Sequence, residues 1–222
     1  MGFQKGEKRA NSHHPQCVTL VIDDSGSMEE QDKCKQVTEA VRNLVITVQS
    51  LSQGSRGYRY LLNICKFGDS PIELAVAQTP PEVDLDALQF MADSGGTDML
   101  PALQWAEAAL KKSLERCRSI PNYREKLAPN PLCIFLSDGE CTGKDPRPAA
   151  EALRAIKFEG GEVDVVAVGV GMLDEHFEMM KAIASRPGYA VRIDSGEVAD
   201  FLGDVQQTVL ENKEVARLAM KR

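Results

Sequence analysis

Short apolar runs alternate along the chain with segments in which apolar residues recur every three or four positions. The runs at residues 17–22 (CVTLVI), 132–136 (LCIFL) and 163–170 (VDVVAVGV) have the length of strands, and their continuous apolar character suits strands covered on both faces. Helical spacing of apolar residues is found at residues 37–51 and 99–114. Strands that alternate with helices predict an α/β fold with a largely parallel sheet.

Two regions depart from this alternation. The strand-like runs at residues 60–67 (YLLNICKF) and 72–77 (IELAVA) are separated only by a short turn-forming segment, so they predict an antiparallel hairpin at one edge of the sheet. We also expect a short helical segment near residues 85–91. The polar, proline-containing stretch at residues 118–131 is longer than a simple turn and connects a helix to the LCIFL strand.

The length and composition predict one domain. The chain has 222 residues, 43% of them hydrophobic and 27% charged, which is enough to bury a full core. We expect the domain at residues 17–212, a polar N-terminal tail at residues 1–16, and a helical extension or tail at residues 213–222. The N-terminal residues lack the apolar stretch of a secretory signal, and no window has the length of a membrane span. These features predict a cytoplasmic protein without membrane insertion.

Charge and cysteine content narrow the possible partners and cross-links. Acidic residues outnumber basic residues by 33 to 26, and no cluster of lysine or arginine interrupts the mixture. A net charge of −7 gives little attraction for a phosphate backbone, so nucleic acid is not an expected partner. The six cysteines are scattered or lie in apolar strand-like runs, which favours free thiols over disulfides.

Two short loops rich in acidic and hydroxyl side chains follow apolar strands. Asp23, Ser25 and Ser27 alternate directly after the first strand, and Asp138 follows the LCIFL strand within Ser-Asp-Gly. Because ligands of an open parallel sheet bind at the carboxyl ends of its strands, we expect the two loops to converge. Thr97, which follows a pair of glycines, contributes a further hydroxyl oxygen.

These two carboxylates and three hydroxyls predict a site for one divalent cation. Oxygen ligands suit hard cations, and the modest number of ligands and charges favours Mg²⁺ or Mn²⁺ over Ca²⁺. Two carboxylates neutralise a divalent ion and leave a coordination position for a carboxylate from another molecule. We therefore expect metal-dependent binding of a protein that offers an Asp or Glu side chain, and no catalysis.

Three of these residues also have a purely structural interpretation. Ser27 with Glu30 fits a capping box, Thr97 could cap the long helix that follows it, and Asp138 could be an ordinary turn residue. The alternating spacing at the first loop and the position of all three segments favour the metal site. Ser27 can serve both roles.

The combination of these segments resembles the metal-ion-dependent adhesion site of von Willebrand factor A domains. Asp-x-Ser-x-Ser stands at residues 23–27, Thr97 follows paired glycines, and Ser-Asp-Gly stands at residues 137–139. The resemblance covers residues 17–210 and implies a three-layer, Rossmann-like α/β/α fold with one antiparallel edge strand. It also implies that the serines and the threonine bind the metal directly or through water, and that the aspartates often act through water. Asp24 and Glu140 lie beside the motif as candidates for partner contacts.

Within that family, the sequence looks most similar to small intracellular bacterial proteins of the TerY type, which are linked to tellurite resistance and stress response. The similarity rests on the single-domain length, the lack of a signal sequence, and the proline- and tyrosine-bearing connection before Ser-Asp-Gly-Glu. It implies work within a multi-protein complex, with a kinase and a phosphatase as candidate partners.

Two other functions remain as alternatives. Asp23 at a strand end, with Asp138 and a cation, resembles phosphohydrolases of the haloacid-dehalogenase type. Those enzymes need a second aspartate two positions on, where this chain has Ser25. The other alternative is a structural subunit that binds through its helices or through residues 118–131. The sequence favours the binding module over both.

Overall fold

A six-stranded sheet forms the framework of the protein within the residues that the structure describes. The computed structural model describes residues 8–52, 58–159 and 161–211. The strand order is β3-β2-β1-β4-β5-β6; β2 and β3 are antiparallel, and all other neighbouring pairs of this sheet are parallel. The strands are β1 (Gln16–Asp23), β2 (Tyr60–Phe67), β3 (Pro71–Gln78), β4 (Leu132–Ser137), β5 (Asp164–Val170) and β6 (Ala190–Ile193).

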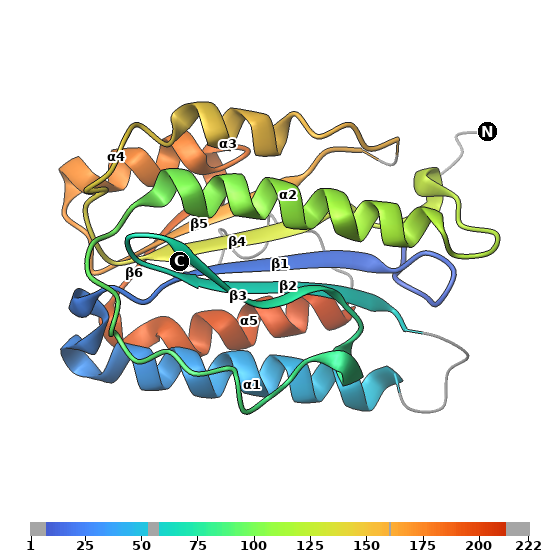
Figure 1. Ribbon diagram of the computed structural model, residues 1–222, viewed down its shortest axis with the longest axis horizontal. Helices are drawn as coiled ribbons and strands as arrows, with labels where there is room; N and C mark the ends of the chain where they lie inside the picture. Colours follow the sequence, from blue (N-terminus) through green and yellow to red (C-terminus); the bar gives the residue numbers. More distant parts are fainter. Residues whose placement is uncertain (1–7, 53–57, 160, 212–222) are drawn as a thin grey trace.

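Helices cover both faces of this sheet (Figure 1). One face is covered by α1 (Lys33–Ser52) and α5 (Val198–Glu211). The other is covered by α2 (Met99–Arg118), α3 (Arg147–Arg154) and α4 (Asp174–Ile183). Parallel neighbours require such crossover connections, whereas β2 and β3 are joined by a tight turn. The fold class and the antiparallel edge strand are therefore as the sequence predicts.

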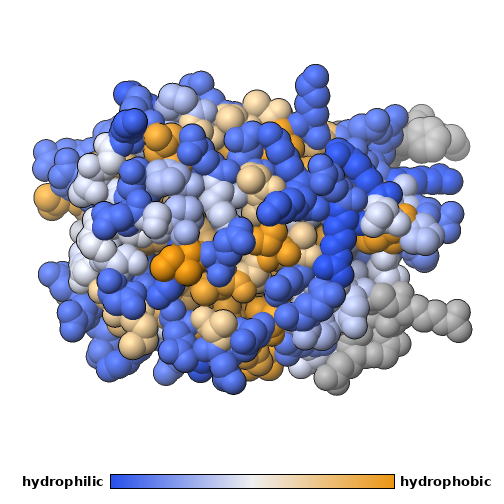
Figure 2. Space-filling view, viewed as in Figure 1, coloured by the Kyte–Doolittle hydropathy of each residue, from blue (hydrophilic) through white to orange (hydrophobic). Residues whose placement is uncertain are grey.

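Burial along each strand explains the hydrophobic pattern. Every position of β1, β4 and β5 is buried, because helices lie against both faces of the central strands. By contrast, β3 is exposed or partly exposed along most of its length, as expected at the edge of the sheet. Figure 2 shows apolar side chains gathered across the middle of the face where this hairpin lies. Ile72 of β3 is 45% exposed.

Residues 85–91 do not form the helix expected from the sequence. Their first residues form a turn, and the rest have no regular secondary structure. Leu88 and Phe90 are both buried, and their backbone groups pair with side chains of α1. Arg42 Nε donates to the Leu88 carbonyl at 3.1 Å, and the Phe90 N–H donates to Thr38 Oγ1 at 3.1 Å. Because side chains of α1 satisfy these backbone groups, the segment does not need the hydrogen bonds of a helix.

The described elements run from β1 to α5. β1 begins at Gln16, directly before the predicted start at residue 17, and α5 ends at Glu211. The predicted extension at residues 213–222 and residues 1–7 of the predicted tail lie outside the described residues. Among the helices in the described ranges, none is both long enough and apolar enough to cross a membrane. All six cysteines are free, as expected.

Candidate metal centre

The two predicted loops leave adjacent strands at the same edge of the sheet. β1 and β4 are parallel neighbours with Ile22 opposite Leu136, so Asp23 and Ser137 follow side by side. The Ser137 hydroxyl donates to Asp23 Oδ2 at 2.5 Å. This edge, which holds the carboxyl ends of the parallel strands, lies at the left in Figure 1. The convergence that topology suggests is therefore present in the structure.

Asp23 is a buried carboxylate whose two oxygens accept hydrogen bonds from uncharged groups. Its side chain accepts from the Ser25 N–H at 2.9 Å in addition to the Ser137 hydroxyl. Burial raises the pKa of Asp23 to about 6. The hydrogen bonds act to lower this pKa, whereas the negative charge of nearby Asp138 acts to raise it. These hydrogen-bond partners are uncharged, so a cation beside Asp23 would stabilise its ionised form.

Ser25, Ser27 and Asp138 form a chain of polar contacts across the two loops. The Ser25 and Ser27 hydroxyl oxygens lie 3.1 Å apart, and the Ser27 hydroxyl donates to Asp138 Oδ1 at 2.6 Å. Ser27 lies within the 3-10 turn η1 (Gly26–Asp32), which precedes α1. Its hydroxyl is therefore directed at the opposite loop, which favours the binding interpretation of Ser27 over the capping box.

Thr97 joins the same cluster from a third segment. The residue that caps α2 is Asp98, whose carboxylate accepts from the Leu100 N–H at 3.2 Å, so the capping interpretation of Thr97 is wrong. Thr97 itself is buried. A Cβ added to Gly139 would lie 3.2 Å from Thr97 Oγ1 and 3.7 Å from Ser27 Oγ, which places both hydroxyls against the backbone of the Ser-Asp-Gly loop. We call Asp23, Ser25, Ser27, Thr97 and Asp138 the oxygen cluster.

Lys33 is a member of this site that the sequence analysis missed. Its ammonium forms an ion pair with Asp138 Oδ2, and the two side chains are only 5% and 1% exposed. Lys33 begins α1 and lies four residues before Val37, one of the buried positions of that helix. That spacing places Lys33 on the buried face of the helix, which is the signal that could have identified it.

Asp24 is a structural residue and is not available to a partner, contrary to the sequence-based expectation. It is completely buried, and its Oδ1 accepts from the Met91 and Ala92 N–H groups at 2.7 and 2.8 Å. Its Oδ2 lies 2.7 Å from the Lys66 ammonium. Burial raises the pKa of Asp24 and Lys66 acts against that shift. Asp24 therefore anchors the segment that leads to Thr97.

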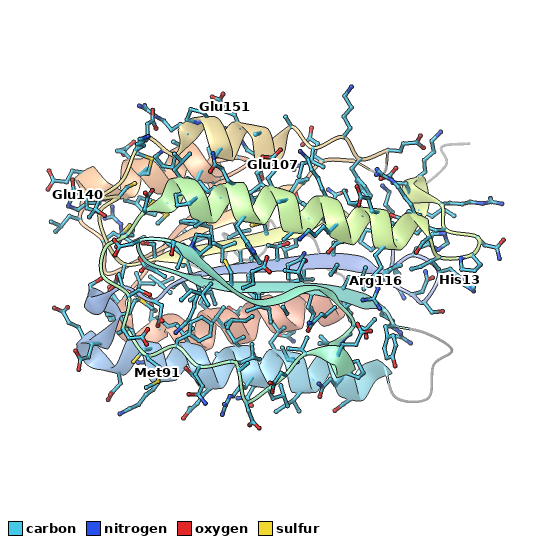
Figure 3. All side chains as sticks on the ribbon, in the orientation of Figure 1. His13, Met91, Glu107, Arg116, Glu140 and Glu151 are labelled. Atoms are coloured by element: carbon cyan, nitrogen blue, oxygen red, sulfur yellow. The ribbon has the colours of Figure 1, made fainter. Side chains whose placement is uncertain are left out.

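Glu140, the other candidate for partner contacts, remains accessible. Its side chain is 71% exposed, and one carboxylate oxygen lies 4.0 Å from the His176 ring. Figure 3 shows Glu140 at the end of the molecule where the strands terminate, and His13 and Arg116 at the opposite end. Glu140 thus lies on the rim around the oxygen cluster.

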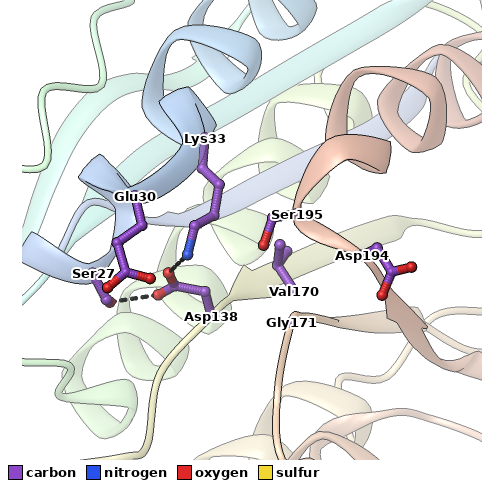
Figure 4. A pocket seen from close by; sticks show the side chains of 8 residues that line it. All are labelled: Ser27, Glu30, Lys33, Asp138, Val170, Gly171, Asp194 and Ser195. Atoms are coloured by element: carbon purple, nitrogen blue, oxygen red, sulfur yellow. Dashed lines mark hydrogen bonds and ion pairs between the residues drawn. The ribbon is translucent and has the colours of Figure 1, made fainter.

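An open pocket of about 430 Å³ lies beside the cluster (Figure 4). Ser27, Lys33 and Asp138 line one side of it, together with Glu30, and Asp194 lies on the other side. Polar surface dominates the lining, so the pocket suits water, ions or a charged side chain better than an apolar ligand. Of the oxygen cluster, Ser27 and Asp138 therefore face this pocket.

The donor set fits a hard divalent cation. In the described parts of the chain, no group of three or more His, Cys, Asp or Glu side chains could hold a metal. A metal at this edge would therefore depend on the serine and threonine oxygens as well as the two carboxylates. Such an all-oxygen set is the chemistry that Mg²⁺ and Mn²⁺ prefer.

Comparison with protein families matches residues 18–208 to the von Willebrand factor type A domain. The matched range contains every residue of the oxygen cluster, as well as Lys33. Curated proteins give no match to the chain.

Several solved structures share the fold at low sequence identity. Proximal thread matrix protein 1 from the mussel byssus is 19% identical with a TM-score of 0.62, over 88% of this chain and 48% of that chain. In another structure of that protein, with 18% identity and a TM-score of 0.63 over 87% and 47% of the two chains, its MIDAS motif is occupied by zinc. The pilus adhesin SpaC from Lactobacillus rhamnosus GG is 17% identical with a TM-score of 0.67, over 94% and 32%. The chain spans less than half the length of these proteins, and the likeness at such identities is one of fold.

Proposed function

The chain belongs to the von Willebrand factor type A domain family, and from this premise we propose that it is a metal-dependent protein-binding module. One divalent cation binds to the oxygen cluster and completes its coordination with an Asp or Glu side chain of a partner protein. One observation carries this proposal: the three segments that hold the oxygen cluster meet in space, although Asp23 and Asp138 are 115 positions apart in the sequence. The Ser27 hydroxyl joins two of these segments by donating to Asp138.

The unequal burial of the cluster supports a direction of approach for the partner. Asp23 and Thr97 are buried, whereas Ser27 is exposed. A cation held by this cluster has its protected side toward the sheet and its open side toward the pocket. Two carboxylates balance its charge, so a partner carboxylate that arrives from the open side is still attracted to the metal.

We propose Mg²⁺ or Mn²⁺ as the ion, with Ca²⁺ less suited. The cluster consists of oxygen donors, and its two carboxylates are fewer than a tight Ca²⁺ site uses. The zinc in the mussel protein supports the view that a motif of this kind accepts more than one divalent metal. Chelation is expected to abolish partner binding whichever of these ions is carried.

The same geometry favours binding over phosphoryl-transfer chemistry. A haloacid-dehalogenase-type phosphohydrolase needs a second aspartate two positions after the first. This chain has Ser25 at that position, and the Ser25 hydroxyl contacts Ser27. Asp23, the would-be nucleophile, is fully buried with both oxygens in hydrogen bonds. We expect no Mg²⁺-dependent turnover of a generic phosphoester above the rate of an Asp23→Asn variant, measured by release of the chromogenic alcohol. Turnover that this variant abolishes would contradict the binding proposal.

The pathway and the location are further parts of the proposal. The proline- and tyrosine-bearing connection before Ser-Asp-Gly-Glu supports a bacterial, cytoplasmic, TerY-like role in stress response or tellurite resistance. A kinase and a phosphatase are then the candidate partners. Glu140 on the exposed rim is the residue that we expect to contact them beside the metal.

Recovery of partner proteins from cell extract tests the binding proposal. A tagged full chain is incubated with Mg²⁺ or with EDTA, and bound proteins are identified by mass spectrometry. We expect recovery with Mg²⁺ to fall to background with EDTA or with Thr97→Ala, which removes one cluster hydroxyl without changing charge. Thr47→Ala is the matched control, because Thr47 lies on α1 well beyond the site and its hydroxyl donates to Asn43 O within the same helix.

The two outcomes have different meanings. Loss of the same proteins with EDTA and with Thr97→Ala, but not with Thr47→Ala, supports the metal-dependent module. Recovery that persists through both treatments would favour the structural-subunit alternative, in which the helices or residues 118–131 form the binding surface.

A further inference from the structure

The oxygen cluster already contains a positive charge supplied by the protein. The Lys33 ammonium contacts Asp138 Oδ2, while the other oxygen of the same carboxylate accepts from the Ser27 hydroxyl. Both side chains of the ion pair are almost completely buried. Each oxygen of this carboxylate therefore has a partner before any metal is considered.

A metal ion and the Lys33 ammonium would both bind the Asp138 carboxylate. A divalent cation that coordinates Asp138 meets an ammonium a single contact away, and two cations at that distance repel each other strongly where water is excluded. Removal of either partner from a buried ion pair leaves the other charge without compensation. Metal binding must therefore either displace the ammonium from Asp138 or lose affinity through repulsion between the two cations.

The pocket beside the cluster offers the displaced ammonium another partner. Lys33, Asp138 and Glu30 line the same pocket, and Figure 4 shows the Glu30 carboxylate close to the ion pair. Glu30 is exposed at the surface of η1, so an ammonium that leaves Asp138 can reach solvent or Glu30 by rotating its flexible four-carbon side chain.

We propose that Lys33 is a tethered cation that competes with the divalent metal for Asp138 and thereby sets the metal affinity of the site. This inference rests on the proposed metal-binding function of the oxygen cluster. It also has a consequence for the partner. When the metal is bound and the ammonium stays in the pocket, the positive charges exceed the two cluster carboxylates, which adds to the attraction of the site for a partner carboxylate.

Titration of the full chain with Mn²⁺ tests this competition directly. Lys33→Met removes the ammonium and keeps an unbranched apolar side chain of similar length. Lys35→Met is the matched control, because it removes the same charge two residues further along α1, where Lys35 is 75% exposed and pairs with Asp32. Free Mn²⁺ is measured by electron paramagnetic resonance, which reports binding without any assay of activity.

We expect Lys33→Met to bind Mn²⁺ about tenfold more tightly than the wild type or more, and Lys35→Met to stay within about twofold of it. If Lys33→Met binds Mn²⁺ and the other two proteins do not, that result would also support the competition. Equal affinity of the wild type and Lys33→Met would overturn it while leaving the metal site intact. Failure of all three proteins to bind Mn²⁺ would overturn the metal site, and the inference with it.

A second measurement needs no variant and covers the case in which Lys33→Met does not fold. The wild-type chain is treated briefly with an amine acetylating reagent, with and without Mn²⁺, and modified lysines are located by peptide mass spectrometry. We expect Mn²⁺ to increase the acetylation of Lys33, which is buried in the ion pair, and to leave exposed Lys35 unchanged. Unchanged protection of Lys33 at a Mn²⁺ concentration that saturates the site would overturn the competition.

Discussion

Replacement of Asp138 by alanine is expected to abolish Mn²⁺ binding and to destabilise the fold at the same time. The substitution removes one of the two carboxylates of the oxygen cluster. It also leaves the buried Lys33 ammonium without its anionic partner. Loss of one partner of a buried ion pair costs about 3–5 kcal/mol where the other charge stays buried, and rotation of Lys33 toward solvent or Glu30 relieves part of that cost. We therefore expect a decrease of up to that size in the free energy of unfolding, measured by urea titration.

A double variant separates these two effects. Lys33→Met combined with Asp138→Ala replaces both charges, and it should regain most of the lost stability without regaining Mn²⁺ binding. Asp145→Ala is the surface control: Asp145 pairs with Arg147 where both side chains are well exposed, and it should cost at most about 1 kcal/mol. If the double variant is as unstable as Asp138→Ala, the unpaired ammonium is not the cause of the instability.

Replacement of Asp24 by alanine is expected to destabilise the protein by a similar amount for a different reason. The substitution leaves the part-buried N–H groups of Met91 and Ala92 without an acceptor and removes the buried carboxylate that lies against the Lys66 ammonium. A donor shielded from water that loses its acceptor costs about 1–3 kcal/mol, and the largely buried Lys66 ammonium also loses a partner, which together predict a loss of about 3–5 kcal/mol in the free energy of unfolding. Urea titration measures this loss.

The same change should weaken the metal site indirectly. Asp24 holds the segment that leads to Thr97, and the Ser94 N–H in that segment donates to the Asp24 carbonyl at 3.1 Å. Mn²⁺ affinity should therefore fall in Asp24→Ala although Asp24 does not contact the metal. Asp24→Asn keeps the acceptor oxygen and should be less destabilised, whereas Glu178→Ala, at an exposed position of α4 where Glu178 pairs with Lys181, should lie within about 0.5 kcal/mol of the wild type. An Asp24→Ala variant as stable as Glu178→Ala would contradict the anchoring role.

Sequence reasoning found the elements that local periodicity defines. The buried runs of β1, β4 and β5 lie where continuous apolar residues predicted them, and the β2–β3 hairpin was indicated by the short turn between two strand-like runs. Residues 85–91 were misassigned because their hydrogen bonds go to α1 side chains. Sequence periodicity carries no information about such long-range partners.

The roles of neighbouring acidic residues also needed the structure. Asp23 and Asp24 are adjacent and chemically identical, yet one belongs to the oxygen cluster and the other faces the backbone of residues 91 and 92. Because successive side chains of an extended segment point in opposite directions, the alternation of Asp23, Ser25 and Ser27 separates them in principle. What Asp24 contacts on its own side depends on a segment nearly seventy positions away.

The sequence by itself determined the α/β class, the edge hairpin and the residue types of the candidate site, because these depend on periodicity and on short local motifs. The tertiary structure decided which of the charges are satisfied within the protein. It brought Lys33 to Asp138 and buried Asp24 against residues distant in sequence. Electrostatic pairing depends on distance in space and on burial, and neither quantity can be read from a linear chain.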